Sequence, residues 1–231
     1  MSDFNGRIKE VVSFDGTYDA VVERAVGSER WRIRVTTCGG HSYGAFGNPN
    51  AIVYLSRLIC RLSQQQIPQR AGRKTTYNVG TINGGTSVNT IAEEAEMTYE
   101  YRSDEKECLD QMRDQFMKII DQFKCPEATF ELELVGERPC TGAIDREEEE
   151  RLLNNCSQLI TDITGEVPSR YAYSTDANLP LSLGIPATTF GLYLGAKAHT
   201  REEWVQINTL NIGLKIAVSL IASHFINSAA Q

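Results

Sequence analysis

The stretch from which the fold is read runs Gly39-Gly40-His41-Ser42-Tyr43-Gly44-Ala45-Phe46-Gly47-Asn48-Pro49-Asn50-Ala51-Ile52. Its closely spaced glycines allow backbone conformations that are closed to other residues and let a ligand approach the chain. Asn48 is the predicted N-cap of the helix that follows, with Pro49 as its first residue, because proline suits that position. His41 is therefore a candidate for substrate contact. The alternative is a surface loop whose histidine is merely solvated.

Before this loop, Trp31, Ile33 and Val35 alternate with polar residues, which predicts a half-buried strand. After the glycine-rich loop, apolar residues recur at helical spacing from Ile52 to Leu62, which predicts a helix that buries one stripe. Strands are predicted over residues 75–82 and 94–101, then a helix after Ser103 and a strand over 130–134. This β-α-β-β-α-β order predicts a ferredoxin-like module, with two helices on one face of a four-stranded antiparallel sheet.

The flanking segments have a different pattern. A short predicted strand ends at Phe14, and after residue 138 three predicted helices alternate with short strands over 171–173 and 186–190. We therefore expect residues 26–137 to form one domain, and residues 1–25 and 138–231 to form a second, incomplete α/β layer. The predicted fold class is α/β (α+β).

Composition narrows the possible functions. The chain has 231 residues, 41% of them hydrophobic and 23% charged, as is usual for a globular protein. A net charge of -7 argues against a nucleic-acid partner. No apolar run is long enough for a membrane span and the first residues lack a signal-peptide core, so we expect no membrane contact and a cytoplasmic location. The 6 cysteines show no C-x-x-C spacing.

Two further residues are candidates for chemistry. Asp15 ends the first predicted strand in an Asp-Gly pair, which is also an ordinary turn sequence. His199 lies at the end of a polar loop, where an imidazole suits a metal ligand or a general acid/base. A helix cap or a solvated side chain is the alternative for His199.

Taken together, the motifs resemble the di-zinc exopeptidase and amidohydrolase family that includes peptidase T, aminoacylase, acetylornithine deacetylase and glutamate carboxypeptidase. The matching motifs, in the family's order, are Ser13-Phe14-Asp15-Gly16, Gly39-Gly40-His41-Ser42, Ser87 to Ala92 with Tyr101-Arg102, and Ser174-Thr175-Asp176-Ala177 with Ala198-His199-Thr200 and Glu203. Each motif alone is weak, but the set is specific and covers nearly the whole chain.

The resemblance implies a zinc-binding α/β domain with an inserted ferredoxin-like lid through which the protein forms a homodimer. It implies two zinc ions, with Asp15 as a ligand of one and His199 as a ligand of the other. His41 matches a lid histidine that reaches the partner subunit's site and stabilises the oxyanion of the transition state. The implied substrates are small peptides or N-acyl amino acids.

The resemblance also assigns substrate-binding roles. Asn89 and Arg102 match lid residues that hold the substrate, and an arginine suits a bidentate grip on a carboxylate. Thr175 matches a substrate-binding loop position, whose conformation we expect Asp176 to fix by hydrogen bonds to the backbone.

One departure from the family affects function. Relatives carry a His-x-Asp motif, a bridging aspartate and a Glu-Glu pair before the strand that ends at Asp15, and only a few residues precede that strand here. A catalytic zinc typically needs three protein ligands. We expect the C-terminal part of a zinc-dependent metallopeptidase or amidohydrolase that is inactive alone. The alternatives are a non-enzymatic dimeric module that binds peptides or amino acids, and one half of a two-chain enzyme.

Overall fold

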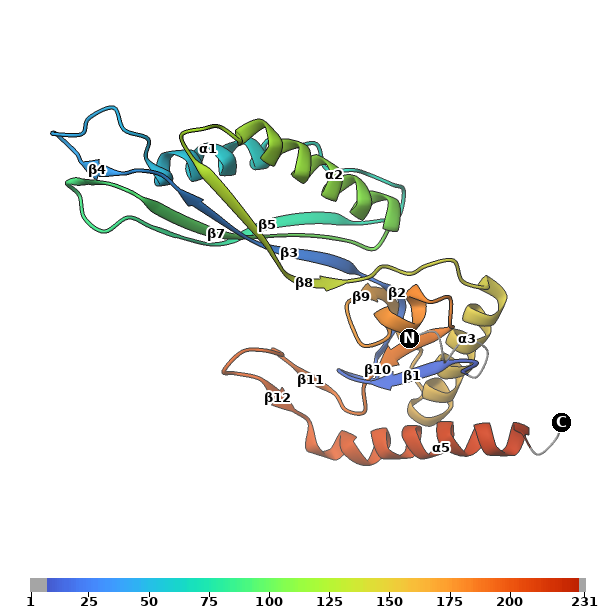
Figure 1. Ribbon diagram of the computed structural model, residues 1–231. Helices are drawn as coiled ribbons and strands as arrows, with labels where there is room; N and C mark the ends of the chain where they lie inside the picture. The colour runs from blue at the N-terminus through green and yellow to red at the C-terminus, as the bar shows by residue number, and fades with distance from the viewer. Residues whose placement is uncertain (1–7, 229–231) are drawn as a thin grey trace. The chain divides into compact units, whose positions relative to one another are not determined.

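The computed structural model describes residues 8–228, with side chains described through Ser223. The chain divides into two compact units (Figure 1). The central unit is Gly27–Arg138, and the other unit combines the chain up to Val26 with the chain from Pro139 onward. Both units combine helices with β-strands, so the predicted mixed α/β class is confirmed.

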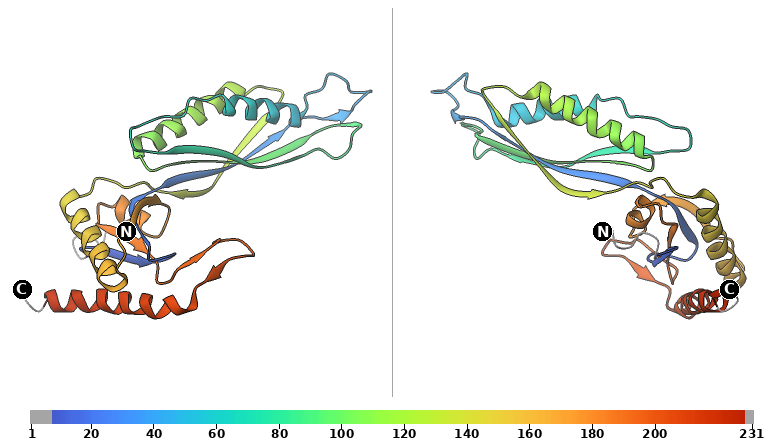
Figure 2. Two further views of the ribbon diagram at one scale, coloured as in Figure 1. Left: turned by 180° about the vertical axis from the view of Figure 1, so that it is seen from behind. Right: turned by 45° about the vertical axis from the view of Figure 1, so that its right-hand side comes forward.

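A four-stranded antiparallel sheet is the base of the central unit. Its strands, in spatial order, are β5 (Thr75–Gly84), β7 (Glu94–Ser103), β3 (Gly27–Thr36) and β8 (Thr129–Arg138). Two helices, α1 (Ala51–Ser63) and α2 (Lys106–Phe123), cover one face of this sheet, as the views of Figures 1 and 2 agree. Along the chain these elements follow the order β3-α1-β5-β7-α2-β8.

Alternation along the strands separates the two faces of the sheet. In β7, Met97 and Tyr99 are buried under the helices, and in β3 Ile33 is buried with them. Tyr99 stacks on Phe116 of α2 at a centroid distance of 5.3 Å. Apolar side chains at every second position thus account for both the strand and the face that the helices cover.

The uncovered face of the sheet is highly charged. Cross-strand ion pairs join Arg30 with Glu100, Arg32 with Glu133 and Arg34 with Glu94. Exposed pairs of this kind contribute about 0–1 kcal/mol each. Their main effect is to favour one register, because a slip by one residue would place these charges under the helices.

Helix α1 begins two residues later than the sequence prediction. Its N-cap is Asn50, whose side chain accepts hydrogen bonds from the backbone N–H groups of Ile52 at 3.0 Å and Val53 at 3.4 Å. The prediction that Asn48 caps the helix is wrong, because its amide donates to the Gly39 carbonyl at 2.7 Å and closes the glycine loop instead.

The other unit is built on two parallel strand pairs. Strand β1 (Val11–Phe14) pairs with β10 (Ala187–Phe190), and β2 (Ala20–Ala25) pairs with β9 (Ser169–Tyr173). The Thr188 hydroxyl donates to the Val22 carbonyl at 2.8 Å and so links the two pairs.

Two helices, α3 (Arg146–Thr164) and α5 (Leu210–Ser228), pack against these strands. Their shared core consists of Tyr18, Val21, Leu152, Cys156, Ile160, Phe190, Ile216 and Leu220. The remaining elements are α4 (Asn178–Ser182), the hairpin of β11 (Gly195–Ala196) and β12 (Trp204–Val205), and the short helix η2 (Ile207–Thr209). Within residues 8–228, every helix is too short or too polar to cross a membrane.

Candidate functional site

His41 and Asn89 lie together on a short two-stranded ribbon. Strand β4 (Gly40–His41) pairs antiparallel with β6 (Thr90–Ile91), which places His41 opposite Thr90. The next residue, Ser42, donates its backbone N–H to the Asn89 carbonyl at 2.9 Å. Backbone pairing thus holds His41 beside Asn89, although the two residues are 48 positions apart in the sequence.

The glycines of the loop hold this ribbon tight. Gly39 has φ +56°, and a Cβ there would lie 2.8 Å from the Ile91 carbonyl oxygen and would overlap Glu93. Only glycine accommodates both the left-handed backbone and this close approach. The glycine-rich sequence therefore serves to place His41 against the 87–91 segment.

The imidazole of His41 is oriented by its own loop. Its Nδ1 accepts hydrogen bonds from the backbone N–H groups of Tyr43 and Gly44, both at 3.3 Å, while the side chain is exposed. A ring nitrogen that accepts hydrogen bonds carries no proton, so the neutral tautomer has its proton on Nε2. His41 thus presents an outward N–H donor, which suits a developing negative oxygen.

The side-chain amide of Asn89 has a hydrogen-bond partner at its oxygen but, among the described residues, none at its nitrogen. Its Oδ1 accepts a hydrogen bond from the Ser87 hydroxyl at 2.7 Å, which orients the side chain. Among the described residues, its Nδ2 has no partner, and the residue is exposed. The amide nitrogen can therefore donate to a carbonyl or carboxylate oxygen.

Arg102 lies at the other end of the sheet from this ribbon. It is eight residues beyond Glu94, the first residue of β7, so a rise of about 3.4 Å per residue separates the two ends by roughly 25 Å. Within one central unit, the structure therefore brings His41 and Asn89 together but places Arg102 apart from both.

The guanidinium of Arg102 already holds a carboxylate, that of Glu100. Nε and Nη2 of Arg102 donate to the two carboxylate oxygens at 3.1 and 3.0 Å, and Arg30 donates to the same group at 3.3 Å. Partial burial acts to raise the pKa of Glu100, but the hydrogen bonds and charges of Arg102 and Arg30 outweigh it, and the net effect is a lowered pKa. Sequence reasoning missed Glu100, although its spacing of two residues from Arg102 on a strand puts both on one face.

Thr175 is buried and its polar groups have partners within its own unit. Its hydroxyl lies 2.9 Å from the Thr189 hydroxyl, and its N–H donates to Oδ1 of Asn178 at 2.8 Å. Asn178 fixes the loop, whereas in the described part of the chain Asp176 is exposed and its side chain forms no hydrogen bond. The expectation that Asp176 fixes this loop is thus wrong, because Asn178, three residues beyond Thr175, has the length to reach back. A substrate contact by Thr175 stays a prediction.

Asp15 and His199 are both exposed residues of the unit formed by the chain up to Val26 and from Pro139 onward, here called the strand unit. Asp15 directly follows β1, and its N–H donates to the Phe190 carbonyl at 3.1 Å. His199 lies in the β11–β12 loop with φ +65°, and its N–H donates to a carboxylate oxygen of Glu203 at 3.1 Å. That hydrogen bond helps to offset the cost of a left-handed backbone, about 1–2 kcal/mol.

Metal binding needs more ligands than these two residues supply. No group of three or more His, Cys, Asp or Glu side chains that could hold a metal ion exists among the residues that the structure describes. A catalytic zinc takes three protein ligands and a water. The described residues by themselves therefore do not fit the two-zinc centre that the sequence resemblance implies.

Comparison with known proteins finds a family match that covers most of the central unit. Residues 25–126 match the family described as the peptidase dimerisation domain. No curated protein sequence matches the chain. Among solved structures, the aminopeptidase PepT from Bacillus cereus matches with a TM-score of 0.71 and 18% identity, over 92% of this chain and 56% of that one.

Two other structures show the same likeness. A tripeptidase from Staphylococcus aureus matches with a TM-score of 0.69 and 20% identity, over 90% of this chain and 55% of that one. An aminobenzoyl-glutamate utilization protein from Klebsiella pneumoniae matches with a TM-score of 0.63 and 15% identity, over 90% and 52%. The chain thus spans about half the length of the solved structures it matches. Residues 25–126 match the peptidase dimerisation domain family, and the chain shares its fold with part of these proteins, which confirms the resemblance seen in the sequence.

Proposed function

We propose that this chain is the dimerising and substrate-binding part of a zinc-dependent metallopeptidase or amidohydrolase that acts on small peptides or N-acyl amino acids. In this proposal the central unit is a ferredoxin-like lid, residues 26–137, inserted in the α/β layer of residues 1–25 and 138–231. The observation that carries the proposal is the separation of Arg102 from the His41–Asn89 ribbon.

That separation is too large for one lid to serve one small substrate. A tripeptide spans at most about 10 Å when extended, whereas Arg102 lies roughly 25 Å along β7 from the end near the ribbon. If Arg102 and Asn89 hold the same substrate, they must come from two copies of the chain. A homodimer would then place His41 and Asn89 of one copy beside Arg102 of the other.

The surface we propose for the homodimer is the edge of β5 together with α1. Strand β5 is at an edge of the sheet, with Ile82 on it 52% exposed. Ile52 and Val53 at the start of α1 are also exposed, and a Cβ on Gly85 would lie 2.9 Å from Cδ1 of Ile52, which shows that strand end and helix start are adjacent. An unpaired strand edge beside exposed apolar side chains is suited to pairing with a second copy.

Within such a site each residue would have a defined task. Nε2–H of His41 would donate to the oxyanion of the tetrahedral intermediate. The Asn89 amide would donate to the substrate, and Arg102 would exchange Glu100 for the substrate carboxylate. Asp15 and His199 would each supply one zinc ligand, and the remaining ligands would come from outside the described residues.

A second possibility, one half of a two-chain enzyme, is favoured by an apolar stripe on α5. Leu210, Leu214, Val218 and Ile221 are 45, 62, 56 and 52% exposed and recur at helical spacing. Ile8, Val12 and Phe14 line an adjoining hollow with Leu220 and Ile221. Exposed apolar surface of this kind marks an interface, so a further α/β element would pack here and could carry zinc ligands.

Calorimetric titration with an N-acetyl amino acid and with a dipeptide tests the proposal. We expect binding that weakens at least about tenfold in Arg102→Ala, because a charge-assisted bidentate pair is lost. Arg32→Ala is the matched control, since Arg32 pairs with Glu133 on the same face of the sheet. Absence of binding heat with both ligands would refute the substrate class, and equal loss in both variants would refute the role of Arg102.

Binding without turnover after zinc is added would favour the non-enzymatic module. Turnover that appears only with a co-purified second chain would favour the two-chain enzyme.

A further inference from the structure

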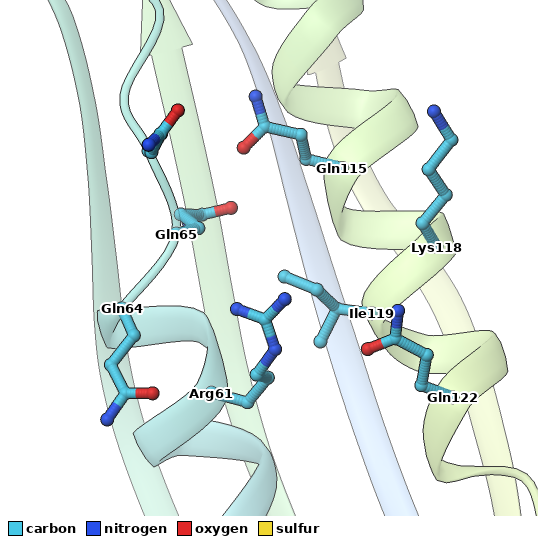
Figure 3. Close-up of a pocket in the computed structure, with 8 residues that line it drawn as sticks. Arg61, Gln64, Gln65, Gln115, Lys118, Ile119 and Gln122 are labelled. Atoms are coloured by element: carbon cyan, nitrogen blue, oxygen red, sulfur yellow. The ribbon is translucent and has the colours of Figure 1, made fainter.

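A polar pocket lies on the central unit between the end of α1 and the face of α2 (Figure 3). Its volume is about 440 Å³, within the usual range for small-molecule sites. Glutamine side chains line it together with Arg61, Lys118 and Ile119. This pocket involves neither His41, Asn89 nor Arg102.

Gln65 is the buried polar group of this pocket. The residue is 9% exposed, and its Nε2 donates to the hydroxyl of Tyr99, which is itself 1% exposed and stacked on Phe116. The hydrogen bond to Tyr99 leaves the amide oxygen directed into the gap between the two helices, as Figure 3 shows. Among the described residues this Oε1 is buried without a hydrogen-bond partner. A buried acceptor without a donor costs free energy, and a ligand with an N–H or O–H group would remove that cost.

The charged groups of the pocket are both positive. Arg61 and Lys118 are exposed, and neither forms an ion pair with any residue that the structure describes. No acidic side chain lines the pocket. The site therefore offers two cations for an oxyanion, beside one buried acceptor that needs a donor.

We propose that this pocket binds a small organic oxyanion, a carboxylate or a phosphate ester, that carries a hydroxyl or amide donor. Arg61 and Lys118 hold the oxyanion, and the donor meets Oε1 of Gln65. Glutamine amides of α2 and of the segment that follows α1 take the remaining polar groups, and Ile119 contacts the carbon skeleton. A ligand here bridges α1 and α2, so its binding stabilises the central unit by mass action.

Titration of the full chain, followed by backbone amide shifts of residues 61–66 and 115–122 in NMR spectra, tests the proposal. Lactate and propionate form one probe pair, and glycerol 3-phosphate and propyl phosphate form the other, each pair differing in hydroxyl donors. We expect at least one hydroxylated probe to bind about fivefold or more tightly than its counterpart, as one added hydrogen bond allows. The pair that shows this preference identifies carboxylate or phosphate as the oxyanion.

Two variants locate the contacts. Lys118→Gln should weaken the hydroxylated probe severalfold, whereas Lys124→Gln, outside the pocket, should not. Gln65→Met should abolish the preference for the hydroxyl, whereas Gln111→Met on the exposed surface of α2 should keep it. The Lys118 variant carries the test if Gln65→Met does not fold, because Lys118 is exposed.

Three results would overturn the proposal. The first is equal affinity for both members of each pair, and the second is an unchanged affinity in Lys118→Gln. The third is the absence of shifts for every probe in titrations that would detect binding as weak as a Kd of about 10 mM, which corresponds to a binding free energy of only about -3 kcal/mol.

Discussion

Arg102 and Glu100 form a bidentate ion pair on one strand, with the two donor–acceptor distances at 3.1 and 3.0 Å. In the proposed function, a substrate carboxylate would use the guanidinium face that this pair occupies. Glu100 would then compete with the substrate for Arg102, and removing its charge should favour the substrate.

Glu100→Gln should thus increase affinity for an N-acetyl amino acid. A neutral amide competes less well for the guanidinium, so we expect a severalfold lower Kd in calorimetry, since a half-buried pair at the surface contributes on the order of 1 kcal/mol. Glu133→Gln is the control, because it removes a carboxylate from Arg32 on the same face. A higher Kd in Glu100→Gln would show that Glu100 orients Arg102 rather than competing for it.

The same pair should make a pH-dependent contribution to stability. The pKa of Glu100 is lowered in the folded protein, so the folded state binds a proton at Glu100 less readily than the unfolded state does. The contribution is complete above the ordinary glutamate pKa of about 4.3 and is lost as pH falls through the lowered value. Urea unfolding of wild type and Glu100→Gln should therefore differ at pH 7 and converge near pH 3. A difference that grows on acidification would contradict this sign.

Glu29 is a buried carboxylate that ties β3 to α2. It is 1% exposed and accepts hydrogen bonds from Arg113, the Tyr101 hydroxyl and Trp31 Nε1, the last at 3.2 Å. Arg113→Met should cost about 2–4 kcal/mol in urea unfolding, because it leaves a buried charge without its cation. The control Lys124→Met removes an exposed pair with Asp121 and should cost at most about 1 kcal/mol. Similar losses in both variants would show that the Glu29 pair is screened by water.

Asn178 should contribute strongly to the stability of the strand unit. Its side chain is buried, accepts from Thr175 and donates to the carbonyls of Val26 and Pro139, both at 2.9 Å. Asn178→Ala should destabilise this unit by about 2–4 kcal/mol, since one buried and two half-buried backbone groups are left unpaired. Asp176→Ala, in the same loop but exposed, should change stability by less than about 0.5 kcal/mol. Hydrogen exchange can resolve the two units, and equal effects there would contradict the assignment to Asn178.

The elements that were predictable have strong periodicity. The alternation at Ala95, Met97 and Tyr99 predicted a strand facing the helices, and these side chains are buried there. Strand β2 was missed because Val21 and Val22 are both buried, and a strand covered on both faces lacks the alternation that marks a half-buried one. The start of α1 was misplaced because two asparagines flank Pro49 and local propensity does not say which one caps.

Parts of the candidate site depend on tertiary pairing, which no local pattern encodes. The glycine-rich loop singled out His41 and the family resemblance singled out Asn89, but only the pairing of β4 with β6 shows that they are neighbours. The free amide oxygen of Gln65 likewise depends on the position of the Tyr99 hydroxyl on another element. The local sequence and the family resemblance therefore supplied the candidate residues, and the pairing of the strands determined which of them lie together.

In the proposed homodimer, Asn89 of one copy and Arg102 of the other act on the same ligand. The most direct measurement mixes Asn89→Ala with Arg102→Ala, allows subunit exchange verified by isotope-labelled native mass spectrometry, and titrates an N-acetyl amino acid. In a twofold-symmetric dimer each mixed pair has one site with both residues intact, so about one quarter of all sites should recover wild-type affinity. Recovery of that fraction is the predicted result. Exchange without any recovery would contradict a site shared between copies.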